Sequence, residues 1–213
     1  MKKKFLLMCV AGVLVMTAVI GGTLAGFNTS AQKQAVSDIT VKSLGITMVG
    51  TGQNEATVEE ISLDSIVPGG TAIVEKNIMN NVEGGYDVYT RVTIDKKWKD
   101  ESLDPSLIKL YAGEEKKELV KGTQVNGWQV EYADEEQVIM YYSLPLKAGE
   151  STADFISALD FHYTMDNTYT GAEVDLSFKA DAIQVIAAED AMPSEWGIYP
   201  VIDAEGKITG IEE

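Results

Sequence analysis

Few residues of this 213-residue chain are of the types that perform nucleophilic or metal-assisted chemistry. The sequence has one histidine, His162, and one cysteine, Cys9. A nucleophilic triad needs a base beside the nucleophile, and a zinc site needs several His, Cys or carboxylate ligands. No HExxH, GxxxxGK[ST] or GxGxxG motif occurs in the sequence. We therefore expect no enzymatic activity, no metal and no cofactor, with His162 as a surface residue of a strand.

Calcium is the metal ion that clustered carboxylates could bind, because calcium needs only oxygen ligands. The stretch MDNTYTGAE resembles a calcium loop, but Thr168 and Thr170 stand where acidic ligands belong and Ser177 holds the twelfth position. The clusters KWKDESLDP and YADEEQV are better explained as solvated acidic turns. A carbohydrate platform is the other binding surface to weigh, although aromatic residues in strands more often pack against neighbouring strands. Its aromatic residues would be Trp98, Trp128, Tyr141 and Tyr142.

The first 26 residues have the layout of a secretory signal peptide. Three lysines, Lys2 to Lys4, precede an apolar run over residues 5–20, and small residues follow it. Cleavage after Ala25 satisfies the small-x-small rule, and cleavage after Gly26 is the alternative. An uncleaved anchor over residues 5–25 would just span a bilayer core of about 30 Å. We expect cleavage, so that the protein is secreted and meets the membrane only through this segment.

Cleavage would leave an acidic chain without cysteine. Cys9 lies early in the apolar run, where it is a small hydrophobic residue and not a lipidation site. The mature chain would have no disulfide, and its 187 residues suit one domain held by its core. Loss of the three lysines lowers the formal charge from −16 to −19. Such a chain should repel nucleic acid and anionic lipid.

Alternation with a period of two runs through the chain from residue 39 and predicts antiparallel strands. Leu44, Ile46 and Met48 share one face of the first strand. The next long strand has one buried and one solvated face; the buried face comprises Tyr86, Val88, Thr90, Val92 and Ile94. A hairpin surrounds an acidic loop, and its inward residues are predicted to be Val130, Tyr132, Val138, Met140 and Tyr142. A last hairpin turns at Glu205 and Gly206.

These patterns predict an all-β fold, a two-sheet antiparallel sandwich of jelly-roll-like type with short helical connections. Only STADFISALDFH, residues 151–162, has a helical pattern, as a connection between the sheets. The expected organisation is a signal peptide over residues 1–26, an extended leader over residues 27–38 and the sandwich over residues 39–213. The leader, FNTSAQKQAVSD, has few large apolar residues and would contribute little to a core.

Several stretches together resemble the TasA/camelysin group of exported proteins of Gram-positive bacteria. GGTLAGF, residues 21–27, is similar to the family's cleavage region, although Leu24 stands where an aromatic residue is more usual. DSIVPGGTAIVEKNIMNNVEGGYDVYTRV, residues 64–92, is similar to its PG turn and the two strands that follow. LKAGEST and FKADAIQV, residues 146–152 and 178–185, are similar to later parts of the family's pattern.

The resemblance implies cleavage between Gly26 and Phe27 by a signal peptidase of the SipW type. It also implies a role in the fibres of biofilm matrix, built by donor-strand complementation, in which the leader of one subunit pairs into the sheet of the next. The contact is head-to-tail and propagates as a homopolymer. The donor-strand residues would be Phe27, Asn28, Thr29, Ala31, Ala35 and Val36. The protease activity ascribed to camelysin is not carried over, because the chain has no recognisable zinc motif.

Three functions therefore stand as hypotheses from the sequence. The first is a secreted structural subunit of an extracellular fibre in the matrix or at the cell surface. The second is a monomeric sandwich that binds a glycan, an ion or a protein through its loops. The third, an extracellular protease, is the least favoured because a catalytic residue set is missing from the sequence.

Overall fold

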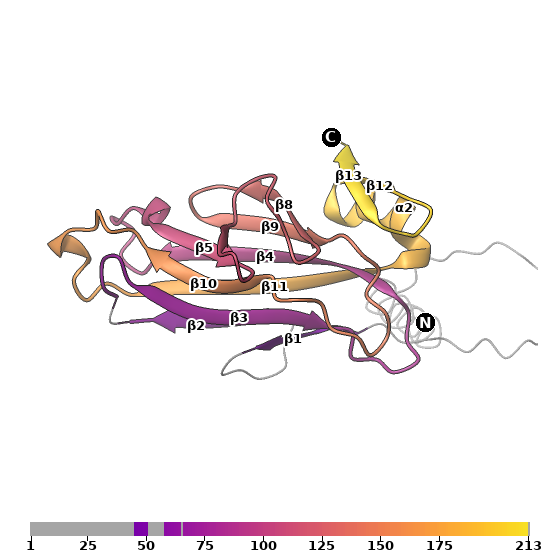
Figure 1. Cartoon of the computed structure of the whole chain (residues 1–213), viewed down its shortest axis with the longest axis horizontal. Coiled ribbons are helices and arrows are strands. Elements are labelled where there is room, and N and C mark those ends of the chain that lie inside the picture. The colour runs from indigo at the N-terminus through magenta and orange to yellow at the C-terminus, as the bar shows by residue number, and fades with distance from the viewer. Residues whose placement is uncertain (1–44, 51–57, 65, 213) are drawn as a thin grey trace, which may run out of the picture. The chain divides into compact units, whose positions relative to one another are not determined.

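Two antiparallel sheets packed face to face form the body of the chain (Figure 1). This computed structural model describes residues 45–50, 58–64 and 66–212, which fall within one unit, residues 41–213. The sheets are ordered β1-β3-β10-β5-β6 and β2-β11-β4-β9-β8-β7, and a separate hairpin is formed by β12 and β13. The strands are β1 (Thr47–Gly50), β2 (Val58–Leu63), β3 (Thr71–Met79), β4 (Val88–Trp98), β5 (Ile108–Ala112), β6 (Lys117–Glu118), β7 (Gln124–Val125), β8 (Trp128–Ala133), β9 (Gln137–Tyr142), β10 (Ile156–Phe161), β11 (Val174–Gln184), β12 (Tyr199–Ile202) and β13 (Ile208–Glu212).

The order of the strands confirms the jelly-roll-like sandwich predicted from the sequence. Successive strands β2, β3, β4 and β5 alternate between the two sheets, and β9, β10 and β11 alternate again. On the return, β11 lies between β2 and β4, while β10 lies between β3 and β5. This interleaving is the connectivity of a jelly roll, in which distant strands become neighbours.

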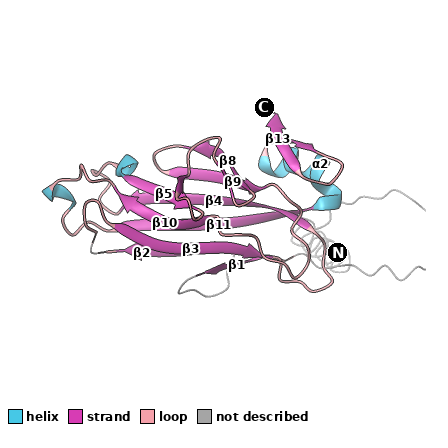
Figure 2. Cartoon of the chain, in the orientation of Figure 1, coloured by secondary structure: helices cyan, strands magenta, loops and turns pink. Residues whose placement is uncertain are grey.

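Within residues 45–50, 58–64 and 66–212, helical structure is confined to short turns outside the strands (Figure 2). The helical turns are η2 (Pro105–Leu107), η3 (Asn167–Tyr169), η4 (Val185–Ala187), α2 (Ala188–Ala191) and the π-helical turn η5 (Met192–Trp196). In the described part of the chain, no helix has the length and apolar character needed to span a membrane. The helical turns given above are the short helical connections that the sequence predicts.

The core lies between the sheets and follows the alternation of the strands. Ile46, Met48, Val92 and Ile94 are buried as predicted, whereas Leu44 lies outside the described residues. Aromatic side chains link the layers. Phe155, for example, packs on Trp128 with ring centroids 5.6 Å apart and on Phe178 at 6.0 Å. A core of this size accounts for a sandwich stabilised by apolar burial.

Residues 151–162 do not form the predicted helical connection. Residues 156–161 are the strand β10, paired with β3 on one side and β5 on the other. Leu159 is fully buried, and Phe161 is 4% exposed. A strand placed between two others gains a ladder of hydrogen bonds on each edge, which overrides the helical preference of its Ala and Leu residues.

Tyr132 does not face the core as predicted. The pairing of β8 with β9 shifts by one residue between Val130 and Tyr132, and this β-bulge turns Tyr132 outward, where it is 45% exposed. The remaining members of the predicted inward set keep their places: Val130, Val138 and Met140 are buried, and Tyr142 packs against the core.

The outer face of β4 is only partly solvated, contrary to the prediction. Tyr89, on that face, is 1% exposed because the segment after β11 covers it. The covering residues, which we call the C-terminal cap, are residues 188–212. Together with Tyr141 and Ile183, the cap builds a second apolar cluster that includes Met192 and Trp196. The last hairpin does turn at Gly206, which has a φ of +83°.

Candidate functional site

The residues that the sequence assigned to cleavage and strand donation lie outside the described residues. They are Gly26, Phe27, Asn28, Thr29, Ala31, Ala35 and Val36. Cleavage and donation therefore stay predictions. The part of the site that can be built from the structure is the surface that would receive a donated strand.

One lateral side of the sandwich is closed by residues 117–125. This stretch leaves the five-stranded sheet as β6, where Glu118 pairs with Tyr111, and enters the six-stranded sheet as β7, where Val125 pairs with Trp128. Between the two strands, the amide of Gly122 donates to the carbonyl oxygen of Val130 at 2.8 Å. Leu119 and Val125 are buried beneath the crossing. A further strand would meet few unpaired backbone groups here.

The opposite lateral side presents strand edges without a described neighbour. There, β1 pairs with only the last four residues of the nine-residue strand β3, from Lys76 to Met79. Among residues 45–50, 58–64 and 66–212, no strand pairs with residues 71–74 of β3 on the β1 side or with the outer edge of β2. We call the edges of β1, β2 and residues 71–74 the open side. Strand edges that have no described neighbour are where an extended segment can add.

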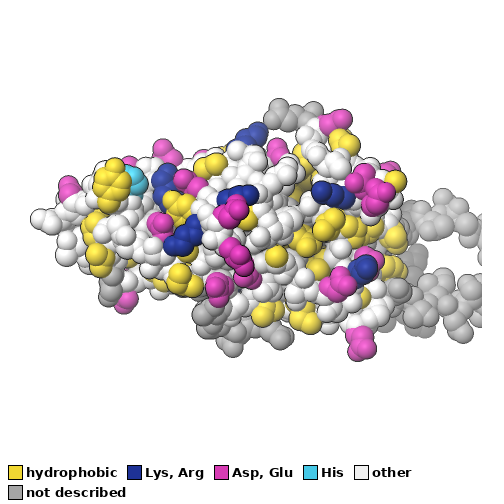
Figure 3. All heavy atoms as spheres, viewed as in Figure 1, with side chains coloured by type: hydrophobic (Ala, Val, Ile, Leu, Met, Phe, Trp, Pro, Cys, Tyr) yellow, Lys and Arg dark blue, Asp and Glu magenta, His cyan; other side chains and the backbone are white. Residues whose placement is uncertain are grey.

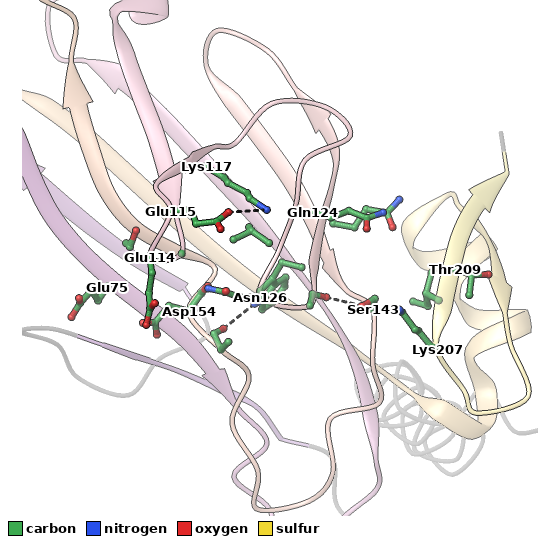
Figure 4. A pocket seen from close by; sticks show the side chains of 18 residues that line it. Glu75, Glu114, Glu115, Lys117, Gln124, Asn126, Ser143, Asp154, Lys207 and Thr209 are labelled. Carbon is green, nitrogen blue, oxygen red and sulfur yellow. Dashed lines mark hydrogen bonds and ion pairs between the residues drawn. The ribbon is translucent and has the colours of Figure 1, made fainter.

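A polar groove of about 970 Å³ lies beside the closed side. Figure 4 shows Glu75, Glu114 and Asp154 toward one end and Lys207 and Thr209 toward the other. The backbone turn at Gly127 forms part of its wall, with a φ of +83°. Carboxylate, amide and hydroxyl groups line the groove, so a ligand that fits it would be polar.

The groove is built by hydrogen bonds that hold its wall rigid. The amide and the hydroxyl of Ser143 both donate to the carbonyl oxygen of Gly127 at 2.8 Å. Asn77 donates its side-chain amide to Asp154 at 3.1 Å, and Trp128 donates its indole N–H to the carbonyl oxygen of Ala153 at 2.9 Å. Trp128 is 1% exposed. Its ring is therefore part of the core and offers no stacking face to a sugar.

The other sequence candidates have structural roles. Trp98 and Tyr141 are buried, so the aromatic residues pack and do not form a carbohydrate platform. The acidic turns fold on themselves: Asp134 accepts from the backbone amides of Glu136 and Gln137, at 2.8 and 2.6 Å. Hydrogen bonds donated to a carboxylate lower its pKa. The pKa of Asp134 is lowered mostly by the hydrogen bond from the Tyr132 hydroxyl, and next by these two backbone bonds. In the described ranges, no three His, Cys, Asp or Glu side chains are placed to hold a metal ion.

His162 lies at the turn after β10. Its backbone amide donates to the carbonyl oxygen of Leu107 at 2.9 Å, and Nδ1 lies 2.7 Å from the hydroxyl of Thr164. The ring packs on Tyr163 with centroids 4.5 Å apart. These contacts are those of a residue in a surface turn. Among them, the imidazole does not link a nucleophile to a carboxylate as the base of a catalytic triad does.

A buried lysine was missed by the sequence reading. Lys96 is 5% exposed, and its ammonium donates to the carbonyl oxygens of Pro105, at 2.8 Å, and of Glu135. Burial and then the nearby Lys109 lower its pKa to about 8. Continuing the alternation of Val92 and Ile94 would have placed Lys96 on the inward face. Its hydrogen bonds attach β4 to η2, which precedes β5, and to the turn between β8 and β9.

The described residues define an all-β jelly-roll-like sandwich with strand edges on one side that have no described neighbour. No protein-family model matches the chain, and no curated protein matches it either. The function is therefore argued from the residues and the geometry described above.

Proposed function

We propose that the protein is a secreted structural subunit of an extracellular fibre in a biofilm matrix. Export through the signal peptide would free the leader at Phe27, and the leader of one subunit would complete the sheet of the next. The subunit would act without catalysis, metal or cofactor. The observation that carries the proposal is the open side, where strand edges lie without a described neighbour.

The contrast between the closed side and the open side supports addition of a strand at the open side. Residues 117–125 occupy the backbone groups on the closed side, whereas on the open side residues 71–74 of β3 and the six residues of β2 have no described neighbour on their outer edges. Six paired residues span about 20 Å of strand. A twelve-residue leader is long enough to cover either edge and still leave a link to residue 39.

Charge also supports attraction between leader and sandwich. The leader has Lys33 and Asp38 as its charged side chains, and cleavage adds a positive amino group, which makes the leader slightly positive. The rest of the mature chain holds the full charge of −19. Sandwich bodies repel one another at neutral pH, but a leader does not add to that repulsion. Acid, salt or divalent cations should therefore promote assembly.

The test compares mature protein, residues 27–213, with a variant lacking residues 27–36. The proposal predicts that the truncated protein folds as a monomer and forms no filaments by electron microscopy. A matched pair at one position tests the main-chain contact: Ala31→Pro removes an N–H donor and weakens assembly, whereas Ala31→Ser keeps it and does not. Filaments of normal morphology from the truncated protein would contradict the proposal.

A second function is supported by the polar groove, namely binding of a polar ligand by a monomer. Glu114, Gln124 and Asn126 offer the acceptors and donors that an oligosaccharide or a cation uses. Size-exclusion chromatography over a range of concentration and pH separates the two functions, with calorimetry against an N-acetylglucosamine oligomer and Ca²⁺. A persistent monomer that binds either probe, and loses binding in Gln124→Ala, would favour this function over the fibre.

A further inference from the structure

Lys96 ends at a hollow in the surface that shares no lining residue with the polar groove. The hollow has a volume of about 610 Å³ and is walled by β5, by residues 118–120 and by the turn between β8 and β9. We call it the lysine hollow, because Lys96 and Lys109 both line it. The Lys96 amine lies at its wall, since one of the carbonyl oxygens that it binds belongs to Glu135, another lining residue.

The next lysine of the same strand lies in a different environment. Side chains alternate along β4, so Lys97 points to the opposite face of the sheet, where it is exposed. Figure 3 shows other exposed basic side chains scattered among acidic ones over one face of the molecule. Lys97 therefore represents the exposed lysines, next to Lys96 in the chain but outside the lysine hollow.

The hydrogen bonds of Lys96 suit an uncharged amine. An ammonium group has three N–H donors, whereas a neutral amine has two and a lone pair. Among the described residues, Nζ has two acceptors within hydrogen-bond distance, the carbonyl oxygens of Pro105 and Glu135. The residue is 5% exposed, so a third N–H would be largely shielded from water without a partner. Loss of one proton matches the donors to the acceptors and frees the lone pair.

The charges that face Lys96 come from three parts of the chain. Lys109 on β5 repels the ammonium form, and three carboxylates near η2 and the β8–β9 turn attract it, those of Asp104, Asp134 and Glu135. Burial and then Lys109 outweigh the carboxylates and lower the pKa of Lys96 to about 8. At pH 7.5 about a quarter of the Lys96 side chains are then neutral, against about 0.1% for a lysine of ordinary pKa. Lys96 is therefore a nucleophile at a pH where ordinary lysines are protonated.

We infer that Lys96 is a modification site that accepts the acyl group of a small activated acyl donor, such as an acyl phosphate or a thioester. The Nζ lone pair attacks the acyl carbonyl carbon and forms a C–N bond, and the bond from that carbon to the leaving group breaks. The leaving group departs with the electron pair of the broken bond, and Nζ releases one proton to water. The product is a neutral amide whose acyl group occupies the lysine hollow. This reaction is separate from fibre assembly and needs one subunit only.

Other small carbonyl reagents suit the surroundings of Lys96 less well. Carbon dioxide would convert the amine to an anionic carbamate near the carboxylates of Asp104, Asp134 and Glu135, where like charge disfavours it. An aldehyde would give a neutral imine, which has no N–H and leaves both carbonyl oxygens without their donor. An amide is uncharged and keeps one N–H, so it avoids the charge repulsion and retains one of the two hydrogen bonds.

The test measures acetylation of Lys96 and Lys97 in the same sample of mature protein. N-hydroxysuccinimidyl acetate is added below one equivalent, and peptide mass spectrometry gives the ratio of acetylation at the two residues. At about pH 7 we expect Lys96 to react about tenfold faster. The ratio should fall about twentyfold between pH 7 and pH 9.5, because an ordinary lysine gains neutral amine over this whole range and Lys96 over its lower part. This change in ratio does not depend on how accessible each amine is.

Two variants test the charge on the wall of the lysine hollow. Lys109→Gln removes the repelling ammonium group, so the pKa of Lys96 rises and the ratio at pH 7 should fall about threefold. Lys117→Gln is the matched control, because that lysine pairs with Glu115 at 3.4 Å and does not line the lysine hollow. It should leave the ratio unchanged. In concentrated urea both lysines are exposed, and they should react alike at every pH.

Acetylation of Lys96 no faster than that of Lys97 at pH 7 overturns the inference. A ratio that stays constant up to pH 9.5 also overturns it, since the two amines would then titrate alike. Circular dichroism and the melting temperature, measured before and after the reaction, verify that the protein is folded throughout. Filaments are not part of the readout, so failure of this inference leaves the proposed fibre standing, and failure of the fibre leaves the acylation site standing.

Discussion

Arg91 on β4 contacts the neighbouring strand β11 with one part of its guanidinium and the C-terminal cap with another. Its Nη2 lies 2.7 Å from the carboxylate of Asp181 on β11, and its guanidinium lies 5.2 Å from the centroid of the Trp196 ring. Both partners of the ion pair are mostly shielded from water, with side-chain exposures of 17% and 26%. The ring of Trp196 in turn packs on Tyr141 with centroids 5.5 Å apart. The arginine therefore fixes the cap over the outer face of the six-stranded sheet.

Replacement of Arg91 should loosen the cap. Arg91→Met removes the ion pair and the cation–π contact, and it leaves the Asp181 carboxylate without its partner. We expect a loss of about 2 kcal/mol in the free energy of unfolding. Urea unfolding followed by tryptophan fluorescence measures it. Lys99→Met is the control: it breaks the half-exposed pair of Lys99 with Glu173 and should hardly change the melting temperature. An equal loss in both variants would contradict the role assigned to Arg91.

Lys96 should make stability rise with pH above neutrality. Its pKa is about 8 in the fold and near its ordinary value of 10.5 in the unfolded chain. Between these values the unfolded chain binds more protons than the folded one, so the free energy of unfolding increases as pH rises. Burial raises the pKa of Tyr89 and Tyr141, which acts in the opposite direction above about pH 10, so the window to measure is about 8 to 9.5.

The variant Lys96→Met isolates this effect. Urea unfolding at intervals of pH should show a rise for wild type that is smaller or absent in Lys96→Met. The contribution of Lys96 is the difference between the two curves, since all other groups titrate in both proteins. Parallel curves for the two proteins would show that Lys96 keeps an ordinary pKa.

Gly127 and Gly149 have the same backbone angle, so replacing each by alanine distinguishes the cost of backbone strain from the cost of a steric clash. Gly127 and Gly149 both have a φ of +83°, which is costly for any residue with a Cβ. A Cβ at Gly127 would lie 2.8 Å from Cε2 of Tyr142, whereas a Cβ at Gly149 would meet nothing within 4 Å. Gly127→Ala should therefore lose about 1 kcal/mol more stability than Gly149→Ala. Equal losses by thermal unfolding would mean that the Tyr142 ring moves aside freely.

The fold was predictable from the sequence where alternation and turn chemistry agree. Residues around β4 and β11 alternate cleanly, and Gly84 and Gly206 take the positive φ that their turns require. Residues 156–161 were misassigned because pairing on both edges, which is a tertiary effect, decides their structure. The bulge before Tyr132 has no signal in the local sequence that we can name.

The C-terminal cap was missed, although the sequence held a signal for it. Tyr89 and Tyr141 stand at the outward positions of alternating strands, and VIMYY, residues 138–142, is apolar without a break. A strand that is apolar on both faces is covered on both faces. The candidate site was less predictable, because the open side depends on which distant strands become neighbours. That order follows from the jelly-roll connections and not from any local pattern.

The most direct measurement is disulfide cross-linking between copies, which is clean because the mature chain has no cysteine. Mature Ala31→Cys is mixed with Ser62→Cys on β2 or Thr71→Cys on β3, and separately with Gln124→Cys on the closed side. The account predicts mixed disulfide dimers under assembly conditions with Ser62→Cys or Thr71→Cys, and few with Gln124→Cys. Equal cross-linking to Gln124→Cys would contradict it. So would a chain carrying both Ala31→Cys and Ser62→Cys that links only within itself, in filaments and monomers alike.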